Sequence, residues 1–168
     1  TFYTPATVVR YMVEVLDPQP GDKKLLDPAC GSGGMFVQAA RYMHAHNANE
    51  AEQMKFRCYG VEKEPDTVKL AKMNLLLNNV RGDITEANSF YSDPYNAFGA
   101  FDYVMANPPF NLKSWYDSTL EHDPRWADYQ TPPESNGNYA WILHILSHLK
   151  KQSGVAGFLL ANGALNDS

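Results

Sequence analysis

The chain has 168 residues, 44% of them hydrophobic, and a formal net charge of −5, which suits a single domain over residues 1–168 with a proper apolar core. It contains no run of about 18 apolar residues and no basic stretch followed by an apolar one at its start, which argues against a membrane span and a secretory signal. Cys30 and Cys58 lie in no Cys-x-x-Cys arrangement, so we expect two reduced core cysteines in a cytoplasmic protein.

The chain opens with a helical pattern and then a strand. Thr4 suits the N-cap and Pro5 the first helical position, and apolar residues of 9–16 recur at helical spacing. Residues 24–27 form a short predicted strand. The glycine-rich turn over 28–34 then leads toward a second helix, so strand, glycine loop and helix follow one another.

The same alternation continues through the middle of the chain. The second helix carries its apolar side over residues 35–43, and a second strand over 56–61 ends at Glu62. Pro65 begins a third helix, and residues 84–90 give a weaker strand pattern.

The last third combines two clear patterns with one unpatterned stretch. Residues 101–106 are an apolar and aromatic run that suits a strand buried on both faces, whereas 111–137 show neither helical nor strand periodicity. A helix follows over 142–149, with Ile142, Ile145, Leu146 and Leu149 at helical spacing on its apolar face, and then a buried strand over 155–161. Alternating strands and helices predict an α/β fold with a mostly parallel sheet and helices on both faces.

Polar residues occur where three of these strands end. Gly31, Gly33 and Gly34 let the backbone approach a ligand, and a helix N-terminus follows them. Glu62 ends the second strand, where a carboxylate can accept hydrogen bonds from ribose hydroxyls, and Asn107 follows the strand over 101–106. Ligands of open α/β sheets bind outside the carboxyl ends of the strands, so this set predicts a nucleoside-cofactor site.

The turn over residues 107–110 (NPPF) is rich in acceptors. Two prolines remove two backbone N–H donors and stiffen the chain, so an amide oxygen, a proline carbonyl and the Phe110 ring lie close together. Such a turn could hold a planar group that carries an NH2. The alternative is that the asparagine and the prolines only form an ordinary turn, as such dipeptides often do.

Two common nucleotide motifs are absent. The dinucleotide pattern Gly-x-Gly-x-x-Gly is incomplete because Phe36 stands where its third glycine belongs, and no Gly-x-x-x-x-Gly-Lys-Ser/Thr occurs. These absences disfavour a dinucleotide and exclude P-loop phosphoryl transfer.

Residues 27–34 (DPACGSGG) and 107–110 (NPPF) resemble the motifs of amino-methyltransferases that use S-adenosylmethionine. Residues 2–5 (FYTP), 138–146 (NYAWILHIL) and 160–163 (LANG) are similar to the modification subunit of type I restriction-modification systems, which are N6-adenine DNA methyltransferases. The resemblance covers nearly the whole chain. It implies a Rossmann-like S-adenosylmethionine-dependent methyltransferase fold, of which this chain would be a fragment that lacks the C-terminal strands.

The resemblance implies a role for each matching residue. S-adenosylmethionine would be bound by residues that close over it, hold its methionine part, hold its ribose or lie beside its adenine: Phe2, Tyr3, Thr4, Pro5, Asp27, Ala29, Gly31, Ser32, Gly33, Gly34, Glu62 and Asn88. DNA would be the substrate, and a specificity subunit and a restriction subunit would be the partners, with no membrane and no metal ion involved.

The catalytic turn would consist of Asn107, Pro108, Pro109 and Phe110. An adenine amine is a poor nucleophile because its lone pair is delocalised, and acceptors at the Asn107 side chain and the Pro108 carbonyl would favour a localised lone pair. Phe110 would stack on a base rotated out of the duplex. A methyltransferase for a protein glutamine or an RNA base, and a silent scaffold subunit of this fold, are the alternatives.

Other polar and aromatic residues have simpler explanations. His144 and His148 have a zinc-ligand spacing, but Ile145 stands where a metalloprotease has Glu, which favours ordinary helix histidines. His44 and His46 are expected in solvent. Four aromatic residues after the catalytic turn suit nucleic-acid stacking and coverage of the core equally: Trp115, Tyr116, Trp126 and Tyr129.

Charge is uneven along the chain. Between Gly82 and Leu149 the only basic residues are Lys113 and Arg125, against nine acidic ones. Because proteins that grip duplex DNA neutralise phosphates with Lys and Arg, this stretch predicts weak binding of DNA by the chain alone.

Overall fold

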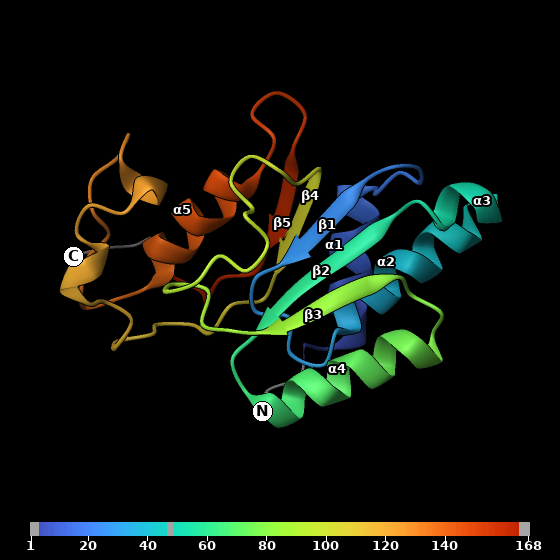
Figure 1. Cartoon of the computed structure of the whole chain (residues 1–168), viewed down its shortest axis with the longest axis horizontal. Helices are drawn as coiled ribbons and strands as arrows, with labels where there is room; N and C mark the ends of the chain where they lie inside the picture. Colours follow the sequence, from blue (N-terminus) through green and yellow to red (C-terminus); the bar gives the residue numbers. More distant parts are fainter. Residues whose placement is uncertain (1–3, 47–48, 165–168) are drawn as a thin grey trace.

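The computed structural model describes residues 4–46 and 49–164, which form a five-stranded sheet with helices on both faces (Figure 1). Every pair of neighbouring strands is parallel, and the order is β3-β2-β1-β4-β5. The predicted α/β fold with a parallel sheet is therefore confirmed. Across these two ranges no helix has the length and apolarity that a membrane crossing needs.

The longer elements follow the order that the periodicity predicts, whereas α3 and the two 3-10 turns were not predicted. In chain order they are α1 (Ala6–Leu16), β1 (Lys24–Asp27), α2 (Gly34–Ala45), α3 (Glu50–Gln53), β2 (Arg57–Glu62), α4 (Pro65–Leu77), β3 (Gly82–Glu86), β4 (Tyr103–Ala106), the 3-10 turns η1 (Ser118–Leu120) and η2 (Pro124–Trp126), α5 (Asn138–His148) and β5 (Val155–Phe158).

Two strand predictions need correction. The weak strand expected over 84–90 is β3, which begins at Gly82 because parallel pairing with β2 starts there, opposite Cys58. The strand expected to be buried over 155–161 ends at Phe158, and Val155 is 47% exposed. This exposure arises because β5 is the edge strand of the sheet within the described residues.

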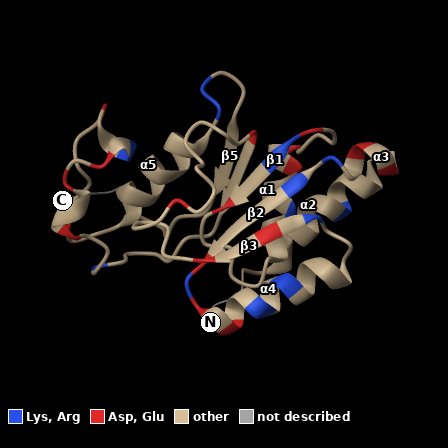
Figure 2. Ribbon diagram, viewed as in Figure 1, with Lys and Arg blue, Asp and Glu red and all other residues tan. Residues whose placement is uncertain are grey.

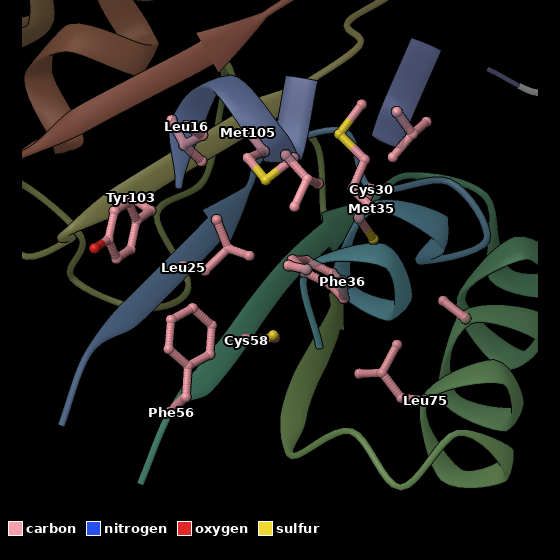
Figure 3. Packing of buried hydrophobic residues seen from close by; sticks show 14 of the residues in the cluster. Leu16, Leu25, Cys30, Met35, Phe36, Phe56, Cys58, Leu75, Tyr103 and Met105 are labelled. Atoms are coloured by element: carbon pink, nitrogen blue, oxygen red, sulfur yellow. The ribbon is translucent and has the colours of Figure 1, made fainter. Parts of the chain in front are cut away.

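One face of the sheet is covered by α1, α2 and α4, as Figure 1 shows. Phe36 of α2 is completely buried and lies between the sheet and Leu75 of α4 (Figure 3). The two cysteines are buried, free residues of the same cluster, as the sequence predicts. The apolar faces of three helices, read from their spacing, are thus combined into one core.

The opposite face is covered by α5 and the segment before β4, with Ile145 packing in the same cluster as Val104. The expected apolar face of this helix is partly wrong. Leu146 is 45% exposed, whereas His144 and His148 are buried with their rings stacked at 4.2 Å between centroids. The helix is rotated so that its histidines, rather than Leu146, face the protein.

The unpatterned stretch after β4 is organised by aromatic packing rather than by long elements. Trp115 and Trp126 are buried in a cluster with Trp141 of α5. The ring centroids of Trp115 and Trp126 lie 5.8 Å apart. Tyr116 is half-buried and Tyr129 is 56% exposed. Coverage of the core is therefore the structural role of both tryptophans.

We expect Gly33→Ala to lower the free energy of unfolding by about 2–4 kcal/mol, because a methyl group meets a buried side chain on a backbone that disfavours it. Gly33 has φ +76°, and a Cβ there would lie 2.8 Å from Leu75 Cδ1.

Gly31→Ala is the matched control, since Gly31 has φ +53° but no atom within 4 Å of its added Cβ. Its cost should be about 1 kcal/mol, from backbone strain alone. Urea unfolding measures both variants, and equal losses would contradict the packing argument.

Candidate active site

Three strand ends meet at one edge of the sheet. Asp27 ends β1, Glu62 ends β2, and Asn107 follows β4. The strand arrowheads in Figure 1 point to this edge, and β1 lies between β2 and β4. The parallel sheet thus brings together the polar residues that the sequence placed at strand ends.

A cavity of about 200 Å³ opens between the ends of β1 and β4. It is lined by residues of the glycine loop, the start of α1, α2 and the catalytic turn: Thr4, Ala6, Val9, Asp27, Ala29, Cys30, Gly31, Ser32, Gly34, Met35, Gln38 and Asn107. Glu62, Asn88 and Phe110 do not line it. The structure therefore gathers part of the predicted set around one cavity and leaves the rest beside it.

Glu62 is bonded to backbone amides. Its Oε2 accepts from the Gly31 N–H at 3.0 Å, and its Oε1 accepts from the N–H groups of Lys63 and Glu64 at 2.8 and 2.9 Å. A carboxylate offers about four lone-pair sites, so these bonds leave room for about one more donor. Glu62 therefore fixes the glycine loop against the end of β2 while keeping limited capacity for a ligand.

Asp27 is a buried carboxyl group in the cavity wall, 1% exposed. Burial raises its pKa from the ordinary 3.8 to about 7, the Ala29 N–H that it accepts at 3.0 Å lowers the pKa, and the charge of Glu62 raises it. A cationic ligand group beside it would favour the charged form. Asp27 is therefore suited to bind a positively charged ligand group.

Asn107 is half-buried and lines the same cavity. Its Nδ2 donates to Thr4 Oγ1 at 2.6 Å, and its buried Oδ1 has no hydrogen-bond partner among residues 4–46 and 49–164. A buried acceptor without a partner costs about 1–3 kcal/mol, which marks this oxygen as a binding group. Thr4 therefore orients the amide with its oxygen free.

The Thr4 contact corrects the predicted helix cap. α1 begins at Ala6 with Pro5 as its N-cap residue, and no side chain caps it. The Thr4 hydroxyl is instead bonded to Asn107, more than 100 positions away in the chain. Phe2 and Tyr3, which were also expected to close over a cofactor, lie outside the described residues.

Pro109, Phe110 and Asn88 face outward, whereas Pro108 does not. Pro108 is buried, Pro109 is exposed, and the Phe110 ring is 46% exposed. Asn88 is exposed, and its Oδ1 accepts from the Phe90 N–H at 3.1 Å. The side-chain oxygen of Asn88 thus forms a local turn, and the Phe110 ring is available to a partner.

Sequence reasoning missed two residues that support the glycine loop. The Ser89 hydroxyl donates to the Pro28 carbonyl, and buried Arg125 donates to the Ser89 carbonyl at 2.9 Å. Arg125 also forms an ion pair with Asp123 at 2.7 Å. Arg125 is one of only two basic residues between Gly82 and Leu149, which singles it out in the sequence. No pattern in the neighbouring residues indicates that its side chain is buried.

His144 and His148 are both buried residues of α5. Burial lowers the pKa of His144 well below its ordinary value, and burial also lowers that of His148. In the part of the chain that the structure describes, no three His, Cys, Asp or Glu residues gather closely enough to hold a metal ion. His44 and His46 are exposed, as the sequence predicts.

A family model described as N-6 DNA Methylase matches residues 1–168. The methylase subunit of the type I restriction enzyme HindI from Haemophilus influenzae is 40% identical over 166 residues, which cover 98% of this chain and 36% of that protein. The methylase subunit of the type I restriction enzyme MjaIX from Methanocaldococcus jannaschii is 39% identical over 170 residues, covering 98% and 29%. The chain thus spans about a third of the length of these curated relatives.

Solved structures show the same similarity. The methyltransferase subunit of a type I restriction-modification system from Streptococcus thermophilus matches with a TM-score of 0.84 at 29% identity, covering 96% of this chain and 35% of that one. A Listeria monocytogenes protein named as a candidate class I S-adenosylmethionine-dependent methyltransferase matches at 0.71 and 16% identity, covering 97% and 46%, which bears on the fold alone. The fold is the Rossmann-like α/β fold of these methyltransferases.

We expect Asp27→Asn to stabilise the chain without ligand at neutral pH. The pKa of Asp27 is near 7 in the fold and near 4 in the unfolded chain, so the fold binds this proton more tightly and loses stability as the pH rises from 4 to 7. An amide does not ionise. The gain at pH 8 should be on the order of 1–4 kcal/mol, and it should vanish near pH 4.

Urea unfolding at several pH values between 4 and 8 measures this gain. Asp66→Asn is the control, because the Asp66 side chain is 95% exposed in its ion pair with Lys69. A difference between Asp27→Asn and the original chain that does not grow with pH would show that Asp27 is not a strained buried acid.

Proposed function

Because the chain belongs to the N-6 DNA methylase family, we propose that it transfers a methyl group from S-adenosylmethionine to the exocyclic N6 amine of an adenine in DNA. The observation that carries this proposal is the buried Asn107 Oδ1, an acceptor without a partner among the described residues, on a side chain whose residue lines the same cavity as the glycine loop. An acceptor held in advance at this place suits an amine that donates hydrogen bonds as it reacts.

The cavity suits the methionine part of S-adenosylmethionine. Asp27 would pair with its ammonium group, and the amino end of α2, where Gly34 and Met35 line the cavity, would favour its carboxylate. Glu62 would accept from a ribose hydroxyl with its remaining capacity, beside Asn88 on the adenine side. When bound, S-adenosylmethionine supplies a methyl group on a positively charged sulfur.

Asn107 would act on the adenine amine through hydrogen bonds. Its Oδ1 and the Pro108 carbonyl would each accept one N–H of the amine, so the nitrogen becomes tetrahedral and its lone pair is no longer delocalised into the ring. The Thr4 bond to Nδ2 keeps the amide from rotating away. Catalysis would then rest on positioning and electrostatics, without a covalent intermediate on the protein.

Phe110 would receive the base. Its ring is 46% exposed and follows the acceptor turn directly, so a base could stack on it while its amine reaches Asn107. An amine inside a duplex cannot reach a cavity in a protein, so the adenine must leave the stack. DNA is favoured over RNA or a protein glutamine as substrate, because the family model and the similar subunits concern DNA methylation or restriction.

Partners would supply the grip on DNA. Arg125 is buried in its ion pair, which leaves Lys113 as the one exposed basic side chain between Gly82 and Leu149. Figure 2 shows basic residues concentrated instead on the strands and helices of the other half of the molecule. A specificity subunit of a type I complex would therefore bind and read the duplex, with a restriction subunit as a further partner and this domain receiving the flipped base.

Asn107→Ala should reduce methyl transfer by roughly 100-fold or more and leave affinity for S-adenosylmethionine nearly unchanged, because it removes one preorganised acceptor. Phe110→Ala should instead raise the apparent KM for DNA. Both are measured in the complete methylase that contains this chain, with radiolabelled methyl transfer and calorimetry.

Substrate controls separate the alternatives. Adenine-containing DNA, adenine-containing RNA and a glutamine-containing protein are offered in parallel, and transfer should occur to DNA alone. Normal turnover by Asn107→Ala would disprove the mechanism, and a chain that binds no S-adenosylmethionine would instead be a silent scaffold.

The chain alone should bind duplex DNA no more tightly than about 10 µM at physiological salt, since its net charge is −5 and Lys113 is the one exposed basic side chain between Gly82 and Leu149. Fluorescence anisotropy with a labelled duplex measures the affinity at several salt concentrations. Addition of the specificity subunit is the positive control. Nanomolar binding by the chain alone with a steep salt dependence would contradict the charge argument.

A further inference from the structure

Asn138 is a buried polar residue to which the reaction has so far assigned no role. It is the first residue of α5 and is 1% exposed, although α5 otherwise buries mainly apolar and aromatic residues. It does not line the cavity between β1 and β4. A fully buried amide is costly unless its donors and acceptor are used, so its partners indicate what it does.

The Asn138 side chain makes a two-way contact with Asn111. Its Oδ1 accepts from the Asn111 backbone N–H at 3.0 Å, and its Nδ2 donates to Asn111 Oδ1 at 3.0 Å. The Asn138 backbone N–H donates to Asn136 Oδ1 at 3.0 Å. One amide therefore holds both the main chain and the side chain of Asn111, an arrangement that we call the Asn138 clamp.

The Asn138 clamp acts one residue after the catalytic turn. Asn111 follows Phe110 directly and has φ +53°, a left-handed backbone conformation that residues with side chains adopt rarely. The clamp holds the chain in that conformation and so fixes the direction in which it leaves Phe110. The other end of the turn is held by the bond between Asn107 and Thr4.

The clamp has a rigid base. α5 packs through Trp141 into the aromatic cluster with Phe90 and Trp115. The N–H of Gly137, just before α5, donates to the Leu112 carbonyl at 2.9 Å. Asn138 can therefore transmit the position of the packed helix to an exposed turn that has little packing of its own.

We propose that Asn138 is a positioning residue for capture of the target base: by clamping Asn111 it holds Phe110 where the flipped adenine stacks. This inference rests on the proposed adenine methylation. Asn138 contacts neither the cavity nor Asn107 itself, so its loss should affect capture of the base more than chemistry on a captured base.

Asparagine-to-aspartate exchanges test the clamp with little change in shape. In Asn111→Asp the new carboxylate still accepts from Asn138 Nδ2. In Asn138→Asp the new carboxylate still accepts the Asn111 N–H, and the Asn111 amide can rotate to donate to it. The double variant sets two carboxylates against each other and breaks the side-chain bond.

In the complete methylase, each single variant should keep the KM for DNA within about threefold of the original, whereas the double variant should raise it by about tenfold or more, as displaced binding groups do. Its kcat at saturating DNA and its affinity for S-adenosylmethionine should stay near the original values. Fluorescence of 2-aminopurine placed at the target adenine should fall in parallel. A double variant that keeps the original KM for DNA overturns the proposal. So does a double variant in which kcat falls about tenfold while KM stays unchanged.

Asn111→Ala covers the case in which the double variant does not fold. Asn111 is exposed, so its truncation removes the side-chain half of the clamp without opening the core. The KM for DNA of Asn111→Ala should rise by more than about threefold, which is the largest change expected for Asn111→Asp or Asn138→Asp. An unchanged KM overturns the proposal.

Hydrogen exchange of the Asn111 amide tests the clamp without any activity. Nuclear magnetic resonance of the chain should show a protected amide in the original and both single variants. Exchange should be faster in the double variant, because repulsion between the two carboxylates moves residue 111 away from the side chain at position 138. Fast exchange in the original chain overturns the clamp itself. A protected amide in a methylase that transfers nothing to DNA refutes the proposed function and, with it, the role in base capture.

Discussion

The parallel pairing of β1 with β4 is the constraint on which the site depends. Leu25 lies opposite Tyr103 and Leu26 opposite Val104, so both strands end at the same edge, with Asp27 beside the start of the catalytic turn. The strand order runs outward from β1 to β3 on one side and from β4 to β5 on the other. The direction in which successive strands are added to the sheet therefore reverses between β1 and β4, which is where open α/β sheets form a ligand crevice.

The site contains one carboxylate that is engaged in holding the backbone and two acceptors that are unfavourable without a ligand. Glu62 ties the glycine loop to the end of β2 through backbone amides. Asp27 has a raised pKa because it is buried, and Asn107 keeps a buried oxygen without a partner among the described residues. Both features cost stability in the ligand-free chain, and binding sites commonly depart from optimal packing in this way.

The half of the molecule after β4 is held by buried polar and aromatic residues instead of long regular elements. Arg125 joins the Ser89 carbonyl to Asp123, and Ser89 in turn joins Pro28 in the glycine loop. Trp115 and Trp126 supply the apolar contacts. Because the Arg125 side chain is buried, the surface around the catalytic turn is more acidic than the composition indicates. We therefore expect other chains to supply the positive charges that bind DNA.

Local pattern determined much of the fold. The strand over 24–27, the helices α1, α2 and α4 and the glycine-rich turn before α2 could be predicted, because hydrophobic periodicity and glycine turns depend on a few neighbouring residues. Convergence of Asp27, Glu62 and Asn107 also followed, since the ends of parallel strands meet at one edge.

Tertiary packing alone decided which polar side chains hold that edge together. Thr4 was predicted as a helix cap but bonds Asn107, Asn138 showed no local signal for its contact with Asn111, and Arg125 was expected only as a scarce surface charge. Asn107 lies 103 positions from Thr4, Asn111 lies 27 from Asn138, and the Ser89 carbonyl that Arg125 binds lies 36 away. A hydrogen bond between such residues exists only after the sheet and helices have packed, so periodicity within a segment cannot predict it.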